Sequence, residues 1–174
     1  MLVYQYHVIA AYYSSCDGGY TADGSELSDP EPYLQARPDP YASESPHLAW
    51  STTIPLADFA RAFREQVGDI GDITSIVPER ADVSGRLTSI AVTGSTGSIK
   101  IGGVQFRRIA GRRLVKSTRI ASLGIEGESI VVRGSGFGHG VGLSQWGAKG
   151  MADQGLGIYA ILGFYYRGAM LSKI

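Results

Sequence analysis

The sequence has almost no cysteine and no long apolar run. Cys16 is the one cysteine among 174 residues, which excludes an internal disulfide and a zinc site made of paired cysteines. No apolar stretch approaches the roughly 20 residues of a membrane-spanning helix. The first residues also lack the basic, apolar and small-residue order of a signal peptide. We therefore expect neither a membrane span nor a signal peptide within this chain.

The net charge of the chain is zero, but its charged residues are unevenly distributed. The chain has 16 basic and 16 acidic residues, yet residues 1–60 contain eight acids and one base. A basic cluster follows later and comprises Arg107, Arg108, Arg112, Arg113, Lys116 and Arg119. The opposed charges can attract each other within one domain, or the cluster can face an anionic polymer. Nucleic-acid binding is not expected, because the cluster lacks interleaved aromatic residues and the total charge is zero.

The pattern of apolar residues predicts an α+β fold, a β-rich single domain of residues 1–174 with a few packed short helices. Residues 2–13 are predicted to form one strand, or two strands joined by a turn near Tyr6 and His7. Further strands are predicted at 87–93, 98–104, 120–123 and 129–133. A helix is predicted within 52–67, with Pro55 suited to its first helical position. Two more helices are predicted at 145–152 and 158–166, and a short helix or basic turn at 106–114. Five prolines in residues 22–49 predict a long surface loop. Because the chain opens inside a predicted strand, we expect it to be truncated at its N-terminus.

Glycine occupies every second position from 134 to 142. In an extended chain these five glycines would leave one face bare, while Phe137, His139 and Val141 would project from the other face. Such a face predicts a close approach, either of another strand in the core or of a ligand. The spacing fits neither the dinucleotide fingerprint, since residues 139 and 141 are His and Val, nor a phosphate-binding loop, since no Gly-Lys-Ser/Thr follows.

Ser144 follows the glycine run and is predicted to cap the next helix by accepting a backbone N–H. Gly155 is predicted to end that helix. His139, Ser144 and Gln145 are then expected together at a strand-to-helix corner, where side chains and free N–H groups commonly meet ligands.

The segment from Gly134 to Ala152, Gly-Ser-Gly-Phe-Gly-His-Gly-Val-Gly-Leu-Ser-Gln-Trp-Gly-Ala-Lys-Gly-Met-Ala, resembles the terminal signature of the stage II sporulation protein D and amidase enhancer family. Residues 165–168, Tyr-Tyr-Arg-Gly, continue the resemblance. Residues 11–21, Ala-Tyr-Tyr-Ser-Ser-Cys-Asp-Gly-Gly-Tyr-Thr, resemble the family's serine-rich Gly-Gly motif. The resemblance covers nearly the whole chain.

This resemblance implies an extracytoplasmic protein that acts on peptidoglycan glycan strands. Some members cut strands stripped of their peptides, as lytic transglycosylases, and others assist an N-acetylmuramoyl-L-alanine amidase. The cutting members use a glutamate that lies before the point where this chain starts. Two hypotheses therefore remain open, a lytic transglycosylase-like protein and a wall-binding module without catalysis that enhances an amidase.

The two best-matched motifs are expected to lie together and line one cleft. They supply the expected substrate-binding residues, which are Ser14, Ser15, Cys16, Gly18, Gly19, His139, Ser144 and Gln145. Structural roles stay open beside these: the serines and Ser144 can satisfy turn or cap groups, and His139 can fix its own loop. Asp17 is the best placed acid for catalysis, although an Asp before Gly-Gly also commonly forms a turn. No metal and no cofactor are expected.

Overall fold

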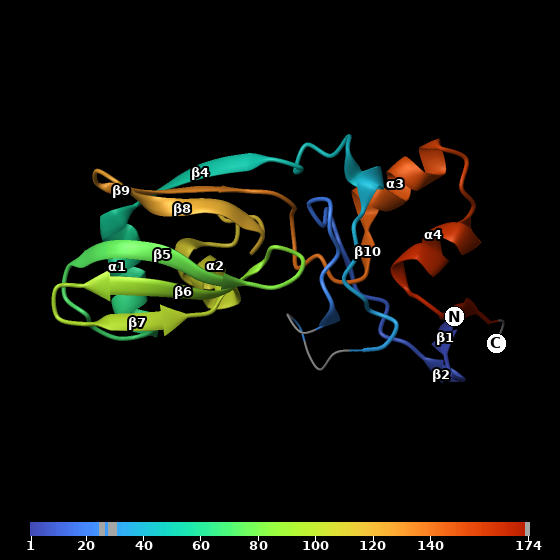
Figure 1. Ribbon diagram of the computed structural model, residues 1–174, viewed down its shortest axis with the longest axis horizontal. Helices are drawn as coiled ribbons and strands as arrows, with labels where there is room; N and C mark the ends of the chain where they lie inside the picture. Colours follow the sequence, from blue (N-terminus) through green and yellow to red (C-terminus); the bar gives the residue numbers. More distant parts are fainter. Residues whose placement is uncertain (25–26, 28–30, 173–174) are drawn as a thin grey trace. The chain divides into compact units, whose positions relative to one another are not determined.

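The computed structural model describes residues 1–24, 27 and 31–172, and the chain divides into two compact units (Figure 1). The first unit joins Met1–Leu48 with Gly136–Ile174, and the second is the continuous segment Ala49–Ser135. The described part of the chain contains four α-helices and eleven strands in several small sheets. This confirms the predicted α+β fold class. None of the helices within the described ranges has the length and apolar character that a membrane crossing requires.

The second unit contains two antiparallel sheets of three strands each. One has the order β4-β9-β8, formed by Trp50–Pro55, Ser129–Gly134 and Ile120–Glu126. The other has the order β5-β6-β7, formed by Ile73–Ala81, Leu87–Gly94 and Ser98–Ile101. Helices α1 (Leu56–Gln66) and α2 (Gly103–Ala110) contribute Phe59, Phe63 and Phe106 to the core. The rings of Phe59 and Phe106 lie 5.4 Å apart, within the range of favourable aromatic pairs.

Three element boundaries predicted for the second unit were wrong, and one strand was missed. Residues 52–55 belong to β4, and the helix begins only at Leu56, because Pro55 has ψ 126° and is extended. Strand β5, which contains Pro78, was not predicted. Both prolines lie in the edge strands of their sheets, where a missing N–H does not interrupt the pairing. The predicted strand over 98–104 ends at Ile101, and α2 begins before the predicted residue 106.

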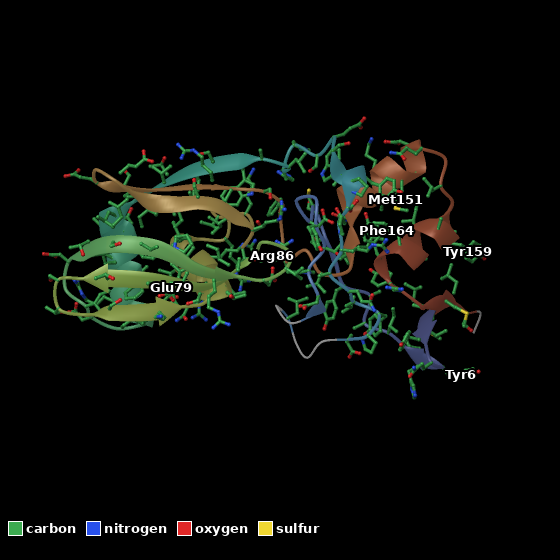
Figure 2. The ribbon with its side chains drawn as sticks, in the orientation of Figure 1. Tyr6, Glu79, Arg86, Met151, Tyr159 and Phe164 are labelled. Atoms are coloured by element: carbon green, nitrogen blue, oxygen red, sulfur yellow. The ribbon has the colours of Figure 1, made fainter. Side chains whose placement is uncertain are left out.

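The first unit has smaller sheets and two helices. Strands β1 (Leu2–Tyr4), β2 (His7–Val8) and β11 (Met170–Leu171) form one sheet in the order β11-β1-β2. The predicted turn near Tyr6 is confirmed, since Gln5 and Tyr6 both have positive φ, as in a tight hairpin. Helices α3 (Gln145–Asp153) and α4 (Ile158–Tyr165) carry Met151 and Phe164, which Figure 2 labels.

The predicted surface loop at 22–49 is more buried than expected. It contains the short 3-10 helix η2 (Pro40–Ala42). Tyr33 and Leu34 are buried in the first unit's core with Val141, Met151 and the two tyrosines that end α4. The prolines were correctly interpreted as excluding a long helix. They do not prevent the segment between them from packing as core.

Candidate functional site

The two motifs that the sequence singled out lie side by side in the first unit. Strand β3 (Tyr13–Ser14) pairs in parallel with β10 (Leu143–Ser144), which Figure 1 labels. Cys16 and Phe137 exchange two backbone hydrogen bonds, of 3.1 and 2.7 Å. Residues more than 120 positions apart are thus joined by backbone pairing, and the expected proximity of the motifs is confirmed. We call residues 13–19 and 137–145 together the motif surface.

The glycine run does not form the extended strand that its alternation suggested. Gly134 is the last residue of β9, but Gly136, Gly138, Gly140 and Gly142 all have positive φ, from 68 to 111°. Residues with side chains rarely adopt this backbone conformation. The alternation therefore produces a looped segment, and the prediction of one bare strand face was wrong.

The close approach predicted for these glycines is confirmed. A β-carbon added to Gly138 would lie 2.7 Å from Cβ of Ser14, nearer than real side chains come. A β-carbon on Gly142 would overlap the carbonyl oxygen of Tyr12, which already accepts hydrogen bonds from the Leu143 N–H and the Tyr166 hydroxyl. The segment that approaches these glycines is the one that contains Tyr12 and Ser14. Positions 138 and 142 therefore require glycine both for its backbone conformation and because there is no room for a side chain.

Ser14 and Ser15 differ in their surroundings. Ser14 is buried, and its Oγ has no hydrogen-bond partner among the residues that the structure describes. Ser15 is half-buried, and its carbonyl accepts from the Trp146 N–H at 3.1 Å. Ser15 therefore helps to hold the start of α3 through its backbone.

The Cys16 side chain is completely buried. Its Sγ accepts a hydrogen bond from the Gly18 N–H at 3.4 Å. Burial is the largest effect on its thiol and raises the pKa, so the thiol is protonated and a poor nucleophile at neutral pH. Cys16 thus contributes packing to the motif surface, whereas Tyr13 and Phe137 are exposed there.

Asp17 has the turn geometry that competed with a catalytic role. It is completely buried, and its Oδ1 accepts from the Gly19 N–H at 2.9 Å, which closes the turn. Gly18 and Gly19 have φ of 81° and 94°, so glycine is needed at both positions. The turn prediction for Asp17 is confirmed, and a buried carboxylate in this position does not contact solvent.

Ser144 caps α3 as predicted. Its Oγ accepts from the Gly147 N–H at 3.2 Å and from the Asp17 N–H at 3.4 Å. One hydroxyl therefore connects the Gly-Gly turn with the helix start. Gln145, the first residue of α3, is exposed. The helix ends at Asp153, and Gly155 follows with φ 83°, as expected for a helix terminus.

His139 is half-buried and held in one orientation. Its Nδ1 accepts from the Val141 N–H at 3.0 Å, which places the proton of the neutral imidazole on Nε2. Its ring meets Tyr12 edge to face, with centroids 6.3 Å apart. The ring thus fixes its own loop, which is one of the two roles predicted for His139. Its other nitrogen, Nε2, is a hydrogen-bond donor.

Aromatic side chains at the motif surface were not predicted as site residues. Tyr13 is 61% exposed and Phe137 is 37% exposed. Phe137 packs edge to face against His47, with centroids 4.9 Å apart. A Phe flanked by two glycines, as in Gly136-Phe137-Gly138, is a sequence signal that could have been used. Exposed rings of this kind offer flat apolar faces next to polar groups, which is the usual composition of ligand sites.

Among the described residues of the first unit, Asp39 is a buried acid besides Asp17, and it was also missed. Its Oδ2 accepts from the Tyr165 hydroxyl at 2.7 Å, and its Oδ1 accepts from the Tyr41 N–H at the start of η2. Burial, followed by the nearby Asp39, raises the pKa of Tyr165 far above its ordinary value. The sequence signal is Pro38-Asp39-Pro40, since an Asp before a proline is a common helix start.

No three His, Cys, Asp or Glu side chains gather closely enough to hold a metal ion within the described ranges. The hydroxyl, imidazole and amide groups of the motif surface are hydrogen-bonding groups, and its exposed rings are stacking groups. This arrangement can bind a polar ligand that also has apolar faces.

Comparison with known proteins agrees with the motifs. The sequence model of a family described as a domain of unknown function, DUF8618, matches residues 33–142. The chain belongs to this family. The DUF8618 chain is also 28% identical to stage II sporulation protein D of Bacillus amyloliquefaciens over 181 residues, and 27% identical to the amidase enhancer of Bacillus subtilis (strain 168) over 222 residues. These relatives confirm the resemblance to stage II sporulation protein D and amidase enhancer.

Each match covers 99% of the DUF8618 chain, but only 48% of the sporulation protein and 31% of the amidase enhancer. The chain therefore spans about half or less of the length of these relatives. No match here assigns a role to an individual residue, so the binding roles of Ser14, Ser15, Cys16, Gly18, Gly19, His139, Ser144 and Gln145 stay predictions.

Proposed function

We propose that the DUF8618 chain binds the glycan strands of peptidoglycan through the motif surface, outside the cytoplasm. The observation that carries the proposal is the pairing of the two motifs, which brings polar groups and exposed aromatic rings together in one unit. A pyranose sugar has C–H-rich faces and a rim of hydroxyl groups. Tyr13 and Phe137 offer rings for the faces, and His139 and Gln145 offer hydrogen bonds for the rim.

The names of two relatives, a stage II sporulation protein and an amidase enhancer, support a role in cell-wall processing. Glycan strands freed of their peptides are the proposed ligand. Without the peptides, the sugar rings are more accessible to a protein surface.

Replacement of a motif-surface ring or imidazole is expected to weaken glycan retention. Phe137→Ala and His139→Ala should each reduce binding of purified, peptide-free glycan strands by about five- to tenfold, as expected for losing one stacking or hydrogen-bonding contact. The measurement is a pull-down over a series of strand concentrations. Phe137 is partly exposed, so its truncation should leave folding intact.

His7→Ala is the matched control, because it removes an exposed histidine from β2 in the same unit. It should bind strands like the wild type. Equal retention by the wild type, Phe137→Ala and His139→Ala would contradict the proposed surface.

A second function, enhancement of an amidase without glycan cleavage, is favoured by the state of the buried acids. Lytic cleavage requires a carboxyl group that first protonates the glycosidic oxygen and then, as a carboxylate, removes a proton from a sugar hydroxyl. Asp17 and Asp39 are both buried, and each binds backbone N–H groups of its own loop. Neither carboxylate is placed to meet a sugar. The amidase that would be enhanced is a proposed partner, suggested by the name of one relative.

Incubation of this chain with peptide-free strands is expected to give no 1,6-anhydro sugar ends. Mass spectrometry of the products is the measurement, with a known lytic transglycosylase as the positive control. Anhydro ends that appear with the wild type and disappear with Asp17→Asn would show that Asp17 is a catalytic acid. Anhydro ends that persist in Asp17→Asn would place the acid elsewhere in the chain, and either result would exclude a purely binding role.

A further inference from the structure

A pocket of about 470 Å³ lies in the first unit, between the segment Tyr33–Pro38 and the end of α4. Two arginines line it, Arg37 and Arg167, together with Tyr33, Gln35 and Phe164. Its volume is in the usual range for a small-molecule site and fits a sugar with its substituents. Neither arginine belongs to the motif surface.

Arg37 is held rigidly at this pocket. Its backbone N–H donates to Thr21 Oγ1 at 3.0 Å, and its Nη1 donates to the Phe164 carbonyl at 3.0 Å. Its guanidinium carbon also lies 3.9 Å from the centroid of the Phe164 ring (Figure 2 labels Phe164). Stacking and one hydrogen bond fix the plane of the group, and most of its five N–H donors remain for another acceptor.

Arg167 is anchored in a similar way from the opposite segment. Its Nη1 donates to Gln35 Oε1 at 2.9 Å, and its backbone N–H donates to the Tyr33 carbonyl at 3.1 Å. Gln35 is itself fixed, since its Nε2 donates to the Pro32 carbonyl at 3.0 Å. Each of the two guanidinium groups therefore donates to an uncharged oxygen, the Phe164 carbonyl for Arg37 and Gln35 Oε1 for Arg167.

Within the described part of the chain, no carboxylate forms an ion pair with either arginine of the pocket. Among residues 1–24, 27 and 31–172, ion pairs are formed by Arg61, Arg64, Lys100 and Lys149, and neither Arg37 nor Arg167 has a carboxylate within 4.0 Å. Guanidinium groups match planar carboxylates, because two parallel N–H donors meet two oxygens. A fixed pair of such groups in a concave site is suited to an anion.

We propose that this pocket is a carboxylate-binding subsite for a sugar acid of the glycan strand. The inference rests on the proposed function for the identity of the polymer. In peptidoglycan each muramic sugar carries a lactyl group, which is a free carboxylate when the peptide has been removed and an amide when the peptide is attached. Arg37 and Arg167 would therefore favour strands without peptides, because the free carboxylate is negatively charged and the amide is not. An attached peptide would also need more space in the pocket than the free carboxylate does.

The test compares peptide-free strands with the same strands after their carboxylates have been converted to primary amides. The wild-type chain is expected to bind the carboxylate strands about tenfold more tightly, as for one charge-assisted hydrogen bond. Arg37→Gln and Arg167→Gln should each bind both preparations with the affinity of the wild type for the amide. Arg167 is exposed, so its variant should fold even if Arg37→Gln does not. Arg133→Gln removes an exposed arginine of β9 and should retain the preference. Equal binding of both preparations by the wild type would overturn the subsite.

A second arm separates this inference from the proposed function. N-acetylmuramic acid and its carboxamide are titrated into the labelled wild-type chain, and the Nε–H signals of Arg37 and Arg167 are followed by NMR. Shifts with the acid and none with the amide support the subsite, even if no strand is retained and the proposed function fails. Absence of shifts with the acid, or larger shifts with glycerol phosphate, would overturn the subsite even if strands bind.

Discussion

Gly142→Ala is expected to lower the free energy of unfolding of the first unit by about 3 to 5 kcal/mol. The φ of 68° alone costs a residue with a side chain about 1 to 2 kcal/mol. The added methyl would also overlap the Tyr12 carbonyl oxygen and lie 3.1 Å from the Tyr166 ring. Relief of this overlap requires separation of β3 and β10, which breaks the bond from the Leu143 N–H.

Urea unfolding followed by the fluorescence of Trp146, in a Trp50→Phe background, measures this effect. Gly155→Ala is the matched control, since Gly155 has φ 83° but no atom within 4 Å of an added β-carbon. The Gly155→Ala variant should lose only about 1 to 2 kcal/mol of unfolding free energy. In the same way, Gly138→Val should destabilise the first unit more than His139→Ala does, because its side chain would collide with Ser14. If Gly142→Ala were as stable as Gly155→Ala, the close approach of the two motifs would not contribute to stability.

The local features of the fold could be predicted because each depends on a few neighbouring residues. The apolar spacing of Leu56, Phe59 and Phe63 indicated α1, and Ser144 before Gln145 indicated the start of α3. The start of α1 was placed too early because proline suits both a first helical turn and an edge strand. Only the pairing of Pro55 with Ser129, distant in the sequence, decides between these.

The conformation of the glycine run could not be predicted for a related reason. Alternating glycines are compatible with an extended strand and with repeated positive φ, and the sequence does not distinguish them. The choice is made by backbone pairing with residues 12–22, as in the bond from the Ala22 N–H to the Gly140 carbonyl. The close approach was predictable because both conformations require it.

The local structure of the motif surface could be predicted where it depends on sequence motifs and was missed where it depends on packing. His139, Ser144 and the Gly-Gly turn were found because their residue types are unusual in that order. Asp39 was missed because a proline-rich, acidic segment is typical of a solvated loop. Its burial depends on Tyr165, which lies 126 positions later.

Asp39→Ala is expected to be the most destabilising replacement of an acidic residue in the first unit, by about 3 kcal/mol. It removes the acceptor of the buried Tyr165 hydroxyl and the cap of η2. Tyr165→Phe should cost about 2 kcal/mol, because one oxygen of the buried carboxylate loses its donor. The same urea unfolding experiment measures both. Since Tyr165 also lines the pocket of Arg37, loss of this bond should reduce the preference for carboxylate strands as well.

The double variant distinguishes a direct interaction from two independent effects. If Asp39 and Tyr165 act through their hydrogen bond, the double variant should be more stable than the sum of the single changes predicts, by about 1 to 3 kcal/mol. Asp153→Ala, at an exposed position at the end of α3, is the control and should unfold like the wild type. Strict additivity would show that the Asp39–Tyr165 bond does not hold α4 against the proline-rich segment.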